Sequence, residues 1–296
     1  MQRSSSSRTV SVRAEIHPTV RDTEFAYTPS DFRRIADLLY AECGISLSDS
    51  KANLVYSRLV KRLRATGQSS FRDYCRLVAS EEGAEERHAM IAAMTTNVTR
   101  FFREPHHFEH LRTVVLPRLT KTMDAGGKVR IWSAGCSSGE EPYSIAMTVL
   151  AAVPNAQERD IKILATDIDP QMVTHGRAAI YPEAAVDSVP SEFARTSLVR
   201  EKSGNGKSYR IADRVRSLVR FNELNLLSDW PMKNRFDVIF CRNVMIYFDD
   251  DTQLNLCRRF AAQLSPNGVL YIGHSERIPV DALPFVLRAQ TTYERR

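Results

Sequence analysis

The chain has 296 residues, of which 43% are hydrophobic and 26% charged, and its formal net charge is +6. This length allows one large domain or two modest ones, and the composition is ordinary for a globular protein. No stretch approaches 18 consecutive apolar residues, which excludes a transmembrane helix and direct membrane insertion, and residues 1–21 lack the apolar segment of a secretory signal. We expect residues 1–24 to form a disordered tail.

Five cysteines are spread along the chain without a Cys-x-x-Cys motif or a cluster of cysteine and histidine. Reduced thiols in a cytoplasmic protein fit this pattern best, and no metal site is expected. The positive net charge indicates an acidic partner without saying which one. No recognised nucleic-acid motif is present, so we do not expect nucleic acid to be that partner.

Residues 25–95 are predicted to form a helical domain. Apolar residues recur with helical spacing after a cap candidate at Thr28, and Gly44 ends that run. A second helix is expected from about Ser50 to Thr66, and two more follow it. Residues 96–127 are then predicted to be a linker and a connecting helix.

Residues 128–296 alternate between short apolar runs and helical segments. Such an alternation predicts an α/β fold with a mostly parallel sheet covered by helices on both faces. The runs that we interpret as strands are Val129–Ala134, Ile161–Ala165, Phe236–Cys241 and Val269–Ile272.

The stretch from about 181 to 220 interrupts this alternation. A turn at Gly204–Gly206 separates two polar segments, and Tyr209–Ile211 and Leu218–Phe221 are candidate strands. The pattern predicts a small inserted β-hairpin or three-stranded unit.

The ends of the first two strands carry residues that suit a ligand. In an open α/β sheet, ligands bind beyond the carboxyl ends of the strands. The first strand runs into Gly135 and Gly139, and glycines allow a sharp turn and a close approach to a ligand. The second strand ends at Asp167, whose carboxylate can accept hydrogen bonds from both hydroxyls of a ribose.

Taken alone, the spacing of Gly135 and Gly139 describes a tight strand-to-helix turn equally well. The acid at Asp167 weakens that interpretation, and the spacing is not the G-x-G-x-x-G of dinucleotide sites. Glu140 and Glu141 follow the loop directly and would repel a diphosphate, whereas a cationic sulfonium would be attracted. The charges therefore favour S-adenosylmethionine over a nicotinamide dinucleotide.

Four segments of the chain carry a resemblance to a known family. The chain resembles the CheR family of chemotaxis receptor glutamate O-methyltransferases from about Phe32 to Tyr293. The resemblance implies a class I (Rossmann-like) methyltransferase sheet with an N-terminal helical domain and a small inserted β-subdomain. The four segments are Thr95–Glu104, Trp132–Ser144, Ala165–Asp169 and Cys241–Phe248.

The resemblance also implies a set of contacts to S-adenosylmethionine and to its product, S-adenosylhomocysteine. Glu140 resembles the acid beside the methionine part, and Asp167 the acid that binds the ribose. Asn225 and Leu226 resemble the pair that flanks the adenine. The complete set of implied cofactor-binding residues is Asn97, Thr99, Arg103, Gly135, Gly139, Glu140, Asp167, Asn225, Leu226, Arg242 and Asn243.

At the reactive end, the resemblance implies catalytic roles for Arg103, Arg242 and Tyr247, which would orient the donor or the acceptor. Plainer alternatives exist for single residues, because Asn97 could cap a helix and Tyr247 could be a core aromatic. Arg100 stands where the family often has a small residue, and its role is left open.

Five basic residues and no acid lie between Lys51 and Arg64. Helical spacing places most of them on one face, while Leu59 and Leu63 point toward a core. A solvated basic face is the plain alternative, whereas the resemblance implies a docking surface for an acidic receptor helix. The five residues are Lys51, Arg58, Lys61, Arg62 and Arg64.

The implied reaction esterifies glutamate side chains in the cytoplasmic domains of methyl-accepting chemotaxis receptors. A glutamate with a pKa of about 4.3 is already ionised at neutral pH, so no catalytic base is needed. The enzyme would be a cytoplasmic monomer recruited to membrane receptor arrays. The resemblance leaves open whether a receptor C-terminal peptide binds at the β-insert.

Two other functions remain open at this point. A methyltransferase acting on an amine would typically carry an Asn/Asp-Pro-Pro-Tyr/Phe run after the fourth strand, where this chain has Arg242–Tyr247. A non-catalytic scaffold that binds the cofactor within a signalling complex is the other alternative.

Overall fold

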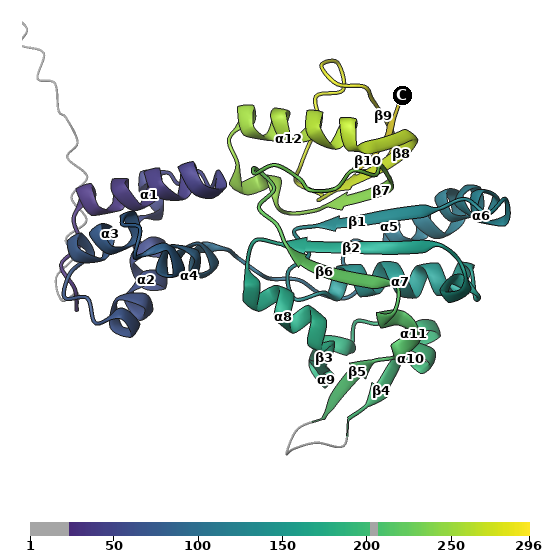
Figure 1. Ribbon diagram of the computed structural model, residues 1–296, viewed down its shortest axis with the longest axis horizontal. Coiled ribbons are helices and arrows are strands. Elements are labelled where there is room, and N and C mark those ends of the chain that lie inside the picture. The colour runs from purple at the N-terminus through teal and green to yellow at the C-terminus, as the bar shows by residue number, and fades with distance from the viewer. Residues whose placement is uncertain (1–23, 202–206) are drawn as a thin grey trace, which may run out of the picture.

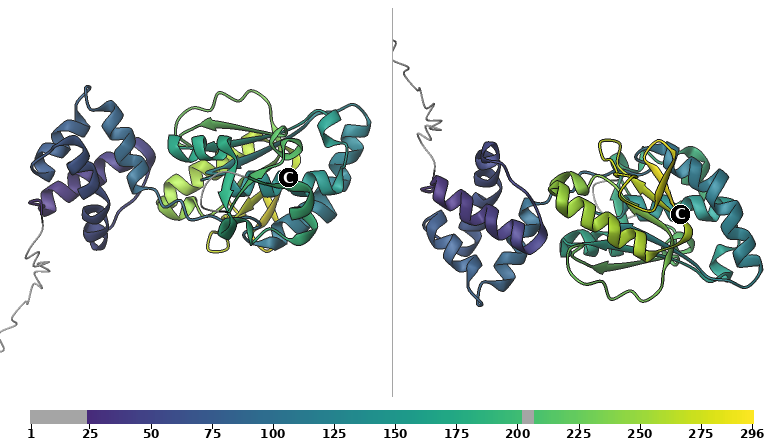
Figure 2. Two further views of the ribbon diagram at one scale, coloured as in Figure 1. Left: turned by 90° about the horizontal axis from the view of Figure 1, so that it is seen from below. Right: turned by 90° about the horizontal axis from the view of Figure 1, so that it is seen from above.

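The structure is a computed structural model that describes residues 24–201 and 207–296. Apart from Glu24, the predicted tail lies outside the described residues, and so does the whole of the predicted turn at Gly204–Gly206. A helical part and a larger α/β part follow one another along the long axis (Figures 1 and 2). None of the described helices has the length and apolarity needed to cross a bilayer.

The helical part begins where the sequence predicts. The hydroxyl of Thr28 accepts a hydrogen bond from the backbone N–H of Asp31, and the Asp31 carboxylate accepts one from the N–H of Thr28, which forms a capping box. The first helix ends at Gly44, whose φ of 72° suits glycine. The helices are α1 (Pro29–Cys43), α2 (Ala52–Thr66), α3 (Phe71–Ala79) and α4 (Ala84–Met94).

These four helices enclose a hydrophobic core of their own. Leu39 of α1, Leu59 and Leu63 of α2 and Tyr74 of α3 are fully buried in it. The core is separate from the two cores that flank the sheet. The predicted inward direction of Leu59 and Leu63 is therefore confirmed.

The α/β part is built on a seven-stranded sheet in the order β6-β2-β1-β7-β8-β10-β9. The first five of these strands run parallel, and β10 pairs antiparallel with β8 and β9. The strand order reverses between β1 and β7, which is where such sheets bind ligands. The strands are β1 (Val129–Ala134), β2 (Ile161–Asp167), β6 (Val219–Glu223), β7 (Phe236–Cys241), β8 (Leu264–Ile272), β9 (Phe285–Ala289) and β10 (Thr292–Arg295).

Both faces of this sheet are buried, as β1 illustrates. Val129 and Ile131 belong to one core, and Trp132 and Ala134 to the other. Alternate strand residues point to opposite faces, so two covered faces require a nearly continuous apolar strand. The covering helices are α5 (Pro105–His110), α6 (Leu116–Asp124), α7 (Glu140–Ala152), α8 (Pro170–Ala178) and α12 (Asp250–Gln263).

The inserted β-unit is three-stranded, in the order β3-β5-β4, but its predicted extent needs correction. Residues 219–223 form β6, which pairs parallel with β2 in the main sheet. The insert therefore ends earlier than position 220, because its last candidate strand satisfies its backbone hydrogen bonds elsewhere. The elements of the insert are β3 (Ile180–Pro182), α9 (Glu183–Val186), α10 (Ser191–Ser197), β4 (Leu198–Arg200), β5 (Ser208–Ile211) and α11 (Asp213–Arg216).

The helical part contacts the loops that follow the strands of the sheet. The Tyr40 hydroxyl donates to the Asp249 carboxylate at 2.7 Å. The backbone N–H of Ser46 donates to the carbonyl of Tyr247, and the Asn225 amide donates to the carbonyl of Glu42. The two parts therefore meet at the carboxyl ends of the strands, where a ligand site is expected.

Candidate functional site

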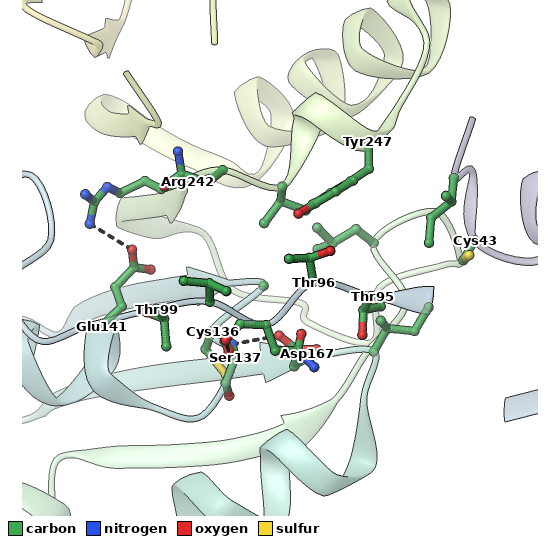
Figure 3. A pocket seen from close by; sticks show the side chains of 18 of the residues that line it. Cys43, Thr95, Thr96, Thr99, Cys136, Ser137, Glu141, Asp167, Arg242 and Tyr247 are labelled. Carbon is green, nitrogen blue, oxygen red and sulfur yellow. Dashed lines mark hydrogen bonds and ion pairs between the residues drawn. The ribbon is translucent and has the colours of Figure 1, made fainter. Parts of the chain in front are cut away.

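A cavity lies at this junction, beyond the ends of β1, β2 and β7, and holds about 990 Å³ of empty space including its open mouth. Its walls are formed by Cys43 at the end of α1, Ile45 just after it, the segment Thr95–Arg100 and the strand-end loops. Figure 3 shows the Arg242–Glu141 pair toward one end of the cavity and Cys43 toward the other.

The loop after β1 is shaped by positive backbone dihedral angles. Gly135 has a φ of 76°, and a Cβ there would approach the Val244 side chain to 2.4 Å, so only glycine fits. Gly139 has a φ of 101° and immediately precedes α7. The loop thus lies close against the segment after β7, and Gly135 lines the cavity while Gly139 does not.

Asp167 is buried at the end of β2 and lines the cavity. Its two carboxylate oxygens accept backbone N–H groups, one from Ser137 at 2.7 Å and one from Asp169 at 3.0 Å. Burial raises the pKa of Asp167 above its usual value, and the backbone donors counteract that effect. These bonds fix the carboxylate and tie the loop after β1 to the end of β2.

The segment after α4 forms the wall opposite these strand ends. The Asn97 side-chain amide donates to the Asp169 carboxylate at 2.9 Å, and the Ser137 hydroxyl donates to the Asn97 carbonyl at 2.9 Å. Further along, the Arg103 guanidinium donates to the Val98 carbonyl at 3.0 Å. Asn97 and Arg103, which the resemblance implies as cofactor contacts, therefore line the cavity on a segment that hydrogen bonds hold in place.

Arg242 follows β7 and is only 6% exposed. Its guanidinium lies 3.0 Å from the Glu141 carboxylate and 3.3 Å from that of Glu104, and it also donates to the Arg103 carbonyl. Burial raises the pKa of Glu141 despite Arg242. Burial also acts to raise the pKa of Glu104, but the charge of Arg242 and hydrogen bonds from His274 outweigh it and lower that pKa.

A second group of polar atoms lies beside this pair. Glu104, His106 and His107 each bring one potential ligand atom within 4.8 Å of the others. The guanidinium of Arg242, 3.3 Å from Glu104, supplies the positive charge at this place. We therefore assign no metal ion to the cluster.

His107 provides a pH-dependent contribution to stability. Burial and the charge of Arg242 lower its pKa to about 3, and its Nε2 lies 2.9 Å from the Thr291 hydroxyl. An unfolded histidine titrates near pH 6.5, so the unfolded chain takes up a proton that the native state does not. Stability should fall by about 2 kcal/mol between pH 7 and pH 5 from this residue alone.

His107→Gln should therefore unfold with a weaker dependence on pH than the wild type, because glutamine does not titrate. Urea denaturation at pH 7 and pH 5 measures the difference, with His88→Gln at an exposed position as the control. Equal pH dependence in the wild type and His107→Gln would contradict a neutral, buried His107.

The structure brings most of the sequence-predicted residues to one cavity. Glu140 does not line it, because its carboxylate accepts a hydrogen bond from Ser138, while the neighbouring Glu141 does. The sequence indicated Glu141 only as a negative charge beside the loop and did not single out Thr96 or the apolar Ile45, all three of which line the cavity. The predicted residues that line the cavity are Asn97, Thr99, Arg103, Gly135, Asp167, Asn225, Leu226, Arg242, Asn243 and Tyr247.

The five basic residues between Lys51 and Arg64 do not form the single free face that their spacing predicts. Arg62 pairs with Glu86, and Arg64 pairs with Glu24. Arg58 donates three hydrogen bonds to the residues at the end of α4. Only Lys51 and Lys61 are exposed without a hydrogen bond or ion pair to the described part of the chain. Arg100 also lies exposed, at the wall of the cavity.

The donors and acceptors of the cavity fit S-adenosylmethionine. Asp167 offers a carboxylate for ribose hydroxyls, and Glu141 brings negative charge to the side where a sulfonium would lie. The Oδ1 atom of Asn243 is buried without a hydrogen-bond partner among the residues that the structure describes, and it can accept a hydrogen bond from an ammonium group. Leu226 and Phe248 supply apolar walls for a base.

Fold and site together define an S-adenosylmethionine-dependent methyltransferase. Family models described as "CheR methyltransferase, SAM binding domain" and "CheR methyltransferase, all-alpha domain" match residues 97–293 and 30–95. The chain belongs to the CheR methyltransferase family.

Curated chemotaxis protein methyltransferases are similar in sequence to this chain over most of their length, which supports the family assignment. The chain is 51% identical to a probable chemotaxis protein methyltransferase of Rhizobium etli, over 83% of this chain and 91% of the relative. It is 41% identical to chemotaxis protein methyltransferase 2 of Pseudomonas aeruginosa, over 88% and 90%. The chemotaxis protein methyltransferase of Escherichia coli is 40% identical, over 90% and 91%.

Proposed function

We propose that this protein transfers a methyl group from S-adenosylmethionine to the carboxylate of glutamate side chains in chemotaxis receptors. The relatives are chemotaxis protein methyltransferases, which supports a receptor as the acceptor. The glutamate carboxylate as the reacting group is what the resemblance to the family implies, and the chemistry of the cavity supports this part of the proposal. We also propose the division into a helical domain over residues 25–95, a linker over 96–127 and a methyltransferase domain over 128–296.

One observation carries the choice of a carboxylate. Within residues 24–201 and 207–296, no histidine lines the cavity. Its two acids are already engaged, Glu141 by Ser133 and Arg242, and Asp167 by two backbone N–H groups. A cavity without an available base suits an acceptor that loses no proton. Glutamate, with a pKa of about 4.3, is such an acceptor.

The residues of the chain then act by positioning. When bound, S-adenosylmethionine supplies an electrophilic methyl group on a sulfonium whose leaving group is neutral. Tyr247 reaches into the cavity opposite Asp167 (Figure 3), and Arg103 lines the same wall as Asn97. Well-oriented reactants can lower a barrier by roughly 7–11 kcal/mol. Arg242 is enclosed by Glu104, Glu141 and the Arg103 carbonyl, so we assign it to holding Arg103 and not to contacting the acceptor.

Receptor contacts are proposed at two places. Lys61 of α2 and Lys51, which directly precedes α2, remain as exposed cations for an acidic receptor surface. The β3-β5-β4 sheet has β3 and β4 at its edges, and an extended receptor C-terminal peptide could add to such an edge as a further strand. Both contacts, and recruitment of a cytoplasmic monomer to receptor arrays, are part of this proposal.

Transfer of radiolabelled methyl groups to purified receptor cytoplasmic domains tests the proposal. We expect label that mild base releases as methanol, because esters hydrolyse where methylated amines do not. A receptor whose acceptor glutamates are replaced by glutamine is the matched control. Base-stable label would indicate a different acceptor, and cofactor binding without any transfer would favour the non-catalytic scaffold.

The pH profile gives a second readout of the mechanism. Without a base, the single-turnover rate should stay nearly flat from about pH 6 to pH 9, because the acceptor remains ionised throughout. A bell-shaped profile that disappears on substitution of one histidine would contradict the mechanism.

A further inference from the structure

The C-terminal end of α4 leaves carbonyl groups without helical partners. The last four carbonyls of any helix lack an N–H partner four residues later. Here the chain turns away after Met94, and Thr95 already has an extended conformation. The carbonyls of Met94 and Thr95 therefore need donors from elsewhere in the fold, and a cation suits the negative end of the helix dipole.

Arg58 of the neighbouring α2 supplies these donors. Its Nη1 donates to the Met94 carbonyl at 2.6 Å and to the Thr95 carbonyl at 2.8 Å, and its Nη2 donates to the Thr96 hydroxyl at 2.7 Å. One guanidinium thus holds three consecutive residues. The planar fork of arginine makes this possible, whereas a lysine ammonium cannot reproduce its geometry.

The same short segment is fixed from its other side by the methyltransferase sheet. Asn97 donates to the Asp169 carboxylate, and the Ser137 hydroxyl donates to the Asn97 carbonyl. Ser137 in turn donates its backbone N–H to Asp167. Hydrogen bonds on both sides of the Thr96–Asn97 backbone therefore connect Arg58, which does not line the cavity, with the Asp167 carboxylate, which does.

We propose that Arg58 is a positioning residue for the cofactor site. It holds the segment Thr95–Asn97 so that this wall of the cavity is in place before the cofactor binds. A preordered wall spares the cofactor the entropy cost of ordering it, which raises affinity. The proposal depends on cofactor binding and not on which side chain accepts the methyl group, so it can fail while the proposed acceptor holds.

This role differs from the docking role that the sequence predicts for Arg58. A docking cation contacts the receptor and leaves cofactor affinity unchanged, and a lysine would largely replace it. A positioning residue affects cofactor affinity even in the absence of receptor. A lysine in its place would not restore that affinity, because it cannot form the same hydrogen bonds. In the described part of the chain Arg58 forms no ion pair, so its hydrogen bonds are the interactions that a substitution removes.

The test is calorimetric titration of the full chain with S-adenosylhomocysteine in the absence of receptor. Arg58→Lys and Arg58→Met should weaken binding by about 2- to 30-fold, the range typical of residues that act on a site from a distance. Thr96→Val, which removes one of the three acceptors, should weaken it less. Lys61→Met controls for lost charge on α2. Arg62→Lys is the control for losing an arginine contact as such. Arg62 binds Glu86, so its contact lies wholly within the helical domain and does not reach the cavity wall.

Steady-state kinetics separate positioning from a general loss of structure. The KM for S-adenosylmethionine should rise in Arg58→Lys, while the KM for receptor and the kcat at saturating cofactor stay near wild type. Thermal unfolding confirms that each variant is folded. Unchanged cofactor affinity in both Arg58 variants, or an equal loss in Arg62→Lys, would overturn the proposal. A receptor KM that rises alone would return Arg58 to the docking role.

Discussion

Replacing Asp167 by alanine is expected to remove most of the affinity for S-adenosylmethionine and S-adenosylhomocysteine. Two hydrogen bonds to a charged carboxylate are worth roughly 2–5 kcal/mol, which is about 30-fold to several thousand-fold in affinity. Alanine also leaves the backbone N–H groups of Ser137 and Asp169 without their acceptor. The loop after β1 should therefore loosen, which adds to the loss.

Calorimetry with S-adenosylhomocysteine measures this effect. Asp187→Ala, at an exposed position, serves as the control for removing an aspartate. Asp167→Asn should lie between alanine and wild type, because it keeps one acceptor oxygen. A folded Asp167→Ala protein with wild-type affinity would exclude Asp167 from the cofactor site.

Replacing Arg242 by methionine should destabilise the methyltransferase domain by about 3–5 kcal/mol, as expected when one partner of a buried ion pair is removed. Glu104 and Glu141, whose side chains are largely but not fully buried, would remain close to one another without the positive charge between them. Methyl transfer should fall too, because Arg242 also holds the carbonyl of Arg103.

The pH dependence of this variant has a defined sign. In the wild type, the lowered pKa of Glu104 contributes stability that is present above pH 4.5 and is lost as the pH falls through its native pKa. Without Arg242, the pKa values of both glutamates should lie above those of the unfolded chain, so the native state takes up protons first. The deficit in stability should therefore shrink as the pH falls toward those raised values.

Urea denaturation at pH 8 and pH 5 checks both the size and the sign. Arg242→Met combined with Glu104→Gln and Glu141→Gln should regain part of the lost stability, because no unpaired charge remains. A loss in the single variant that is below about 1 kcal/mol, or that grows at pH 5, would contradict this account of the buried charges.

Much of the cavity could be predicted because its chemistry lies at the ends of strands. Gly135 has a positive φ, which favours glycine, and Asp167 ends a buried apolar run. Both residues can therefore be recognised from the sequence as candidates for the site. The pairing of Glu141 with Arg242 could not be predicted in the same way. Neighbouring residues on a helix point about 100° apart, and only the fold decides that Glu140 turns to Ser138 while Glu141 meets Arg242.

The other differences between the predictions and the structure also arise because contacts between distant parts of the chain decide the outcome. Residues 219–223 look like part of the insert because they follow it directly, but their partner strand β2 lies more than fifty residues earlier in the chain. Arg58 looks like a surface cation because its acceptors are mainly backbone carbonyls. Carbonyls exist at every residue, so a sequence gives no sign of which ones an arginine will meet.

The order of the strands also bears on how the protein folds as it is synthesised. The central strand β1 pairs with β7, about one hundred residues further along, so the middle of the sheet cannot assemble until most of the chain exists. The four N-terminal helices enclose their own core and contact one another locally. They can fold while the ribosome is still making the sheet. The emerging strands then meet a finished helical domain, already carrying one wall of the cavity.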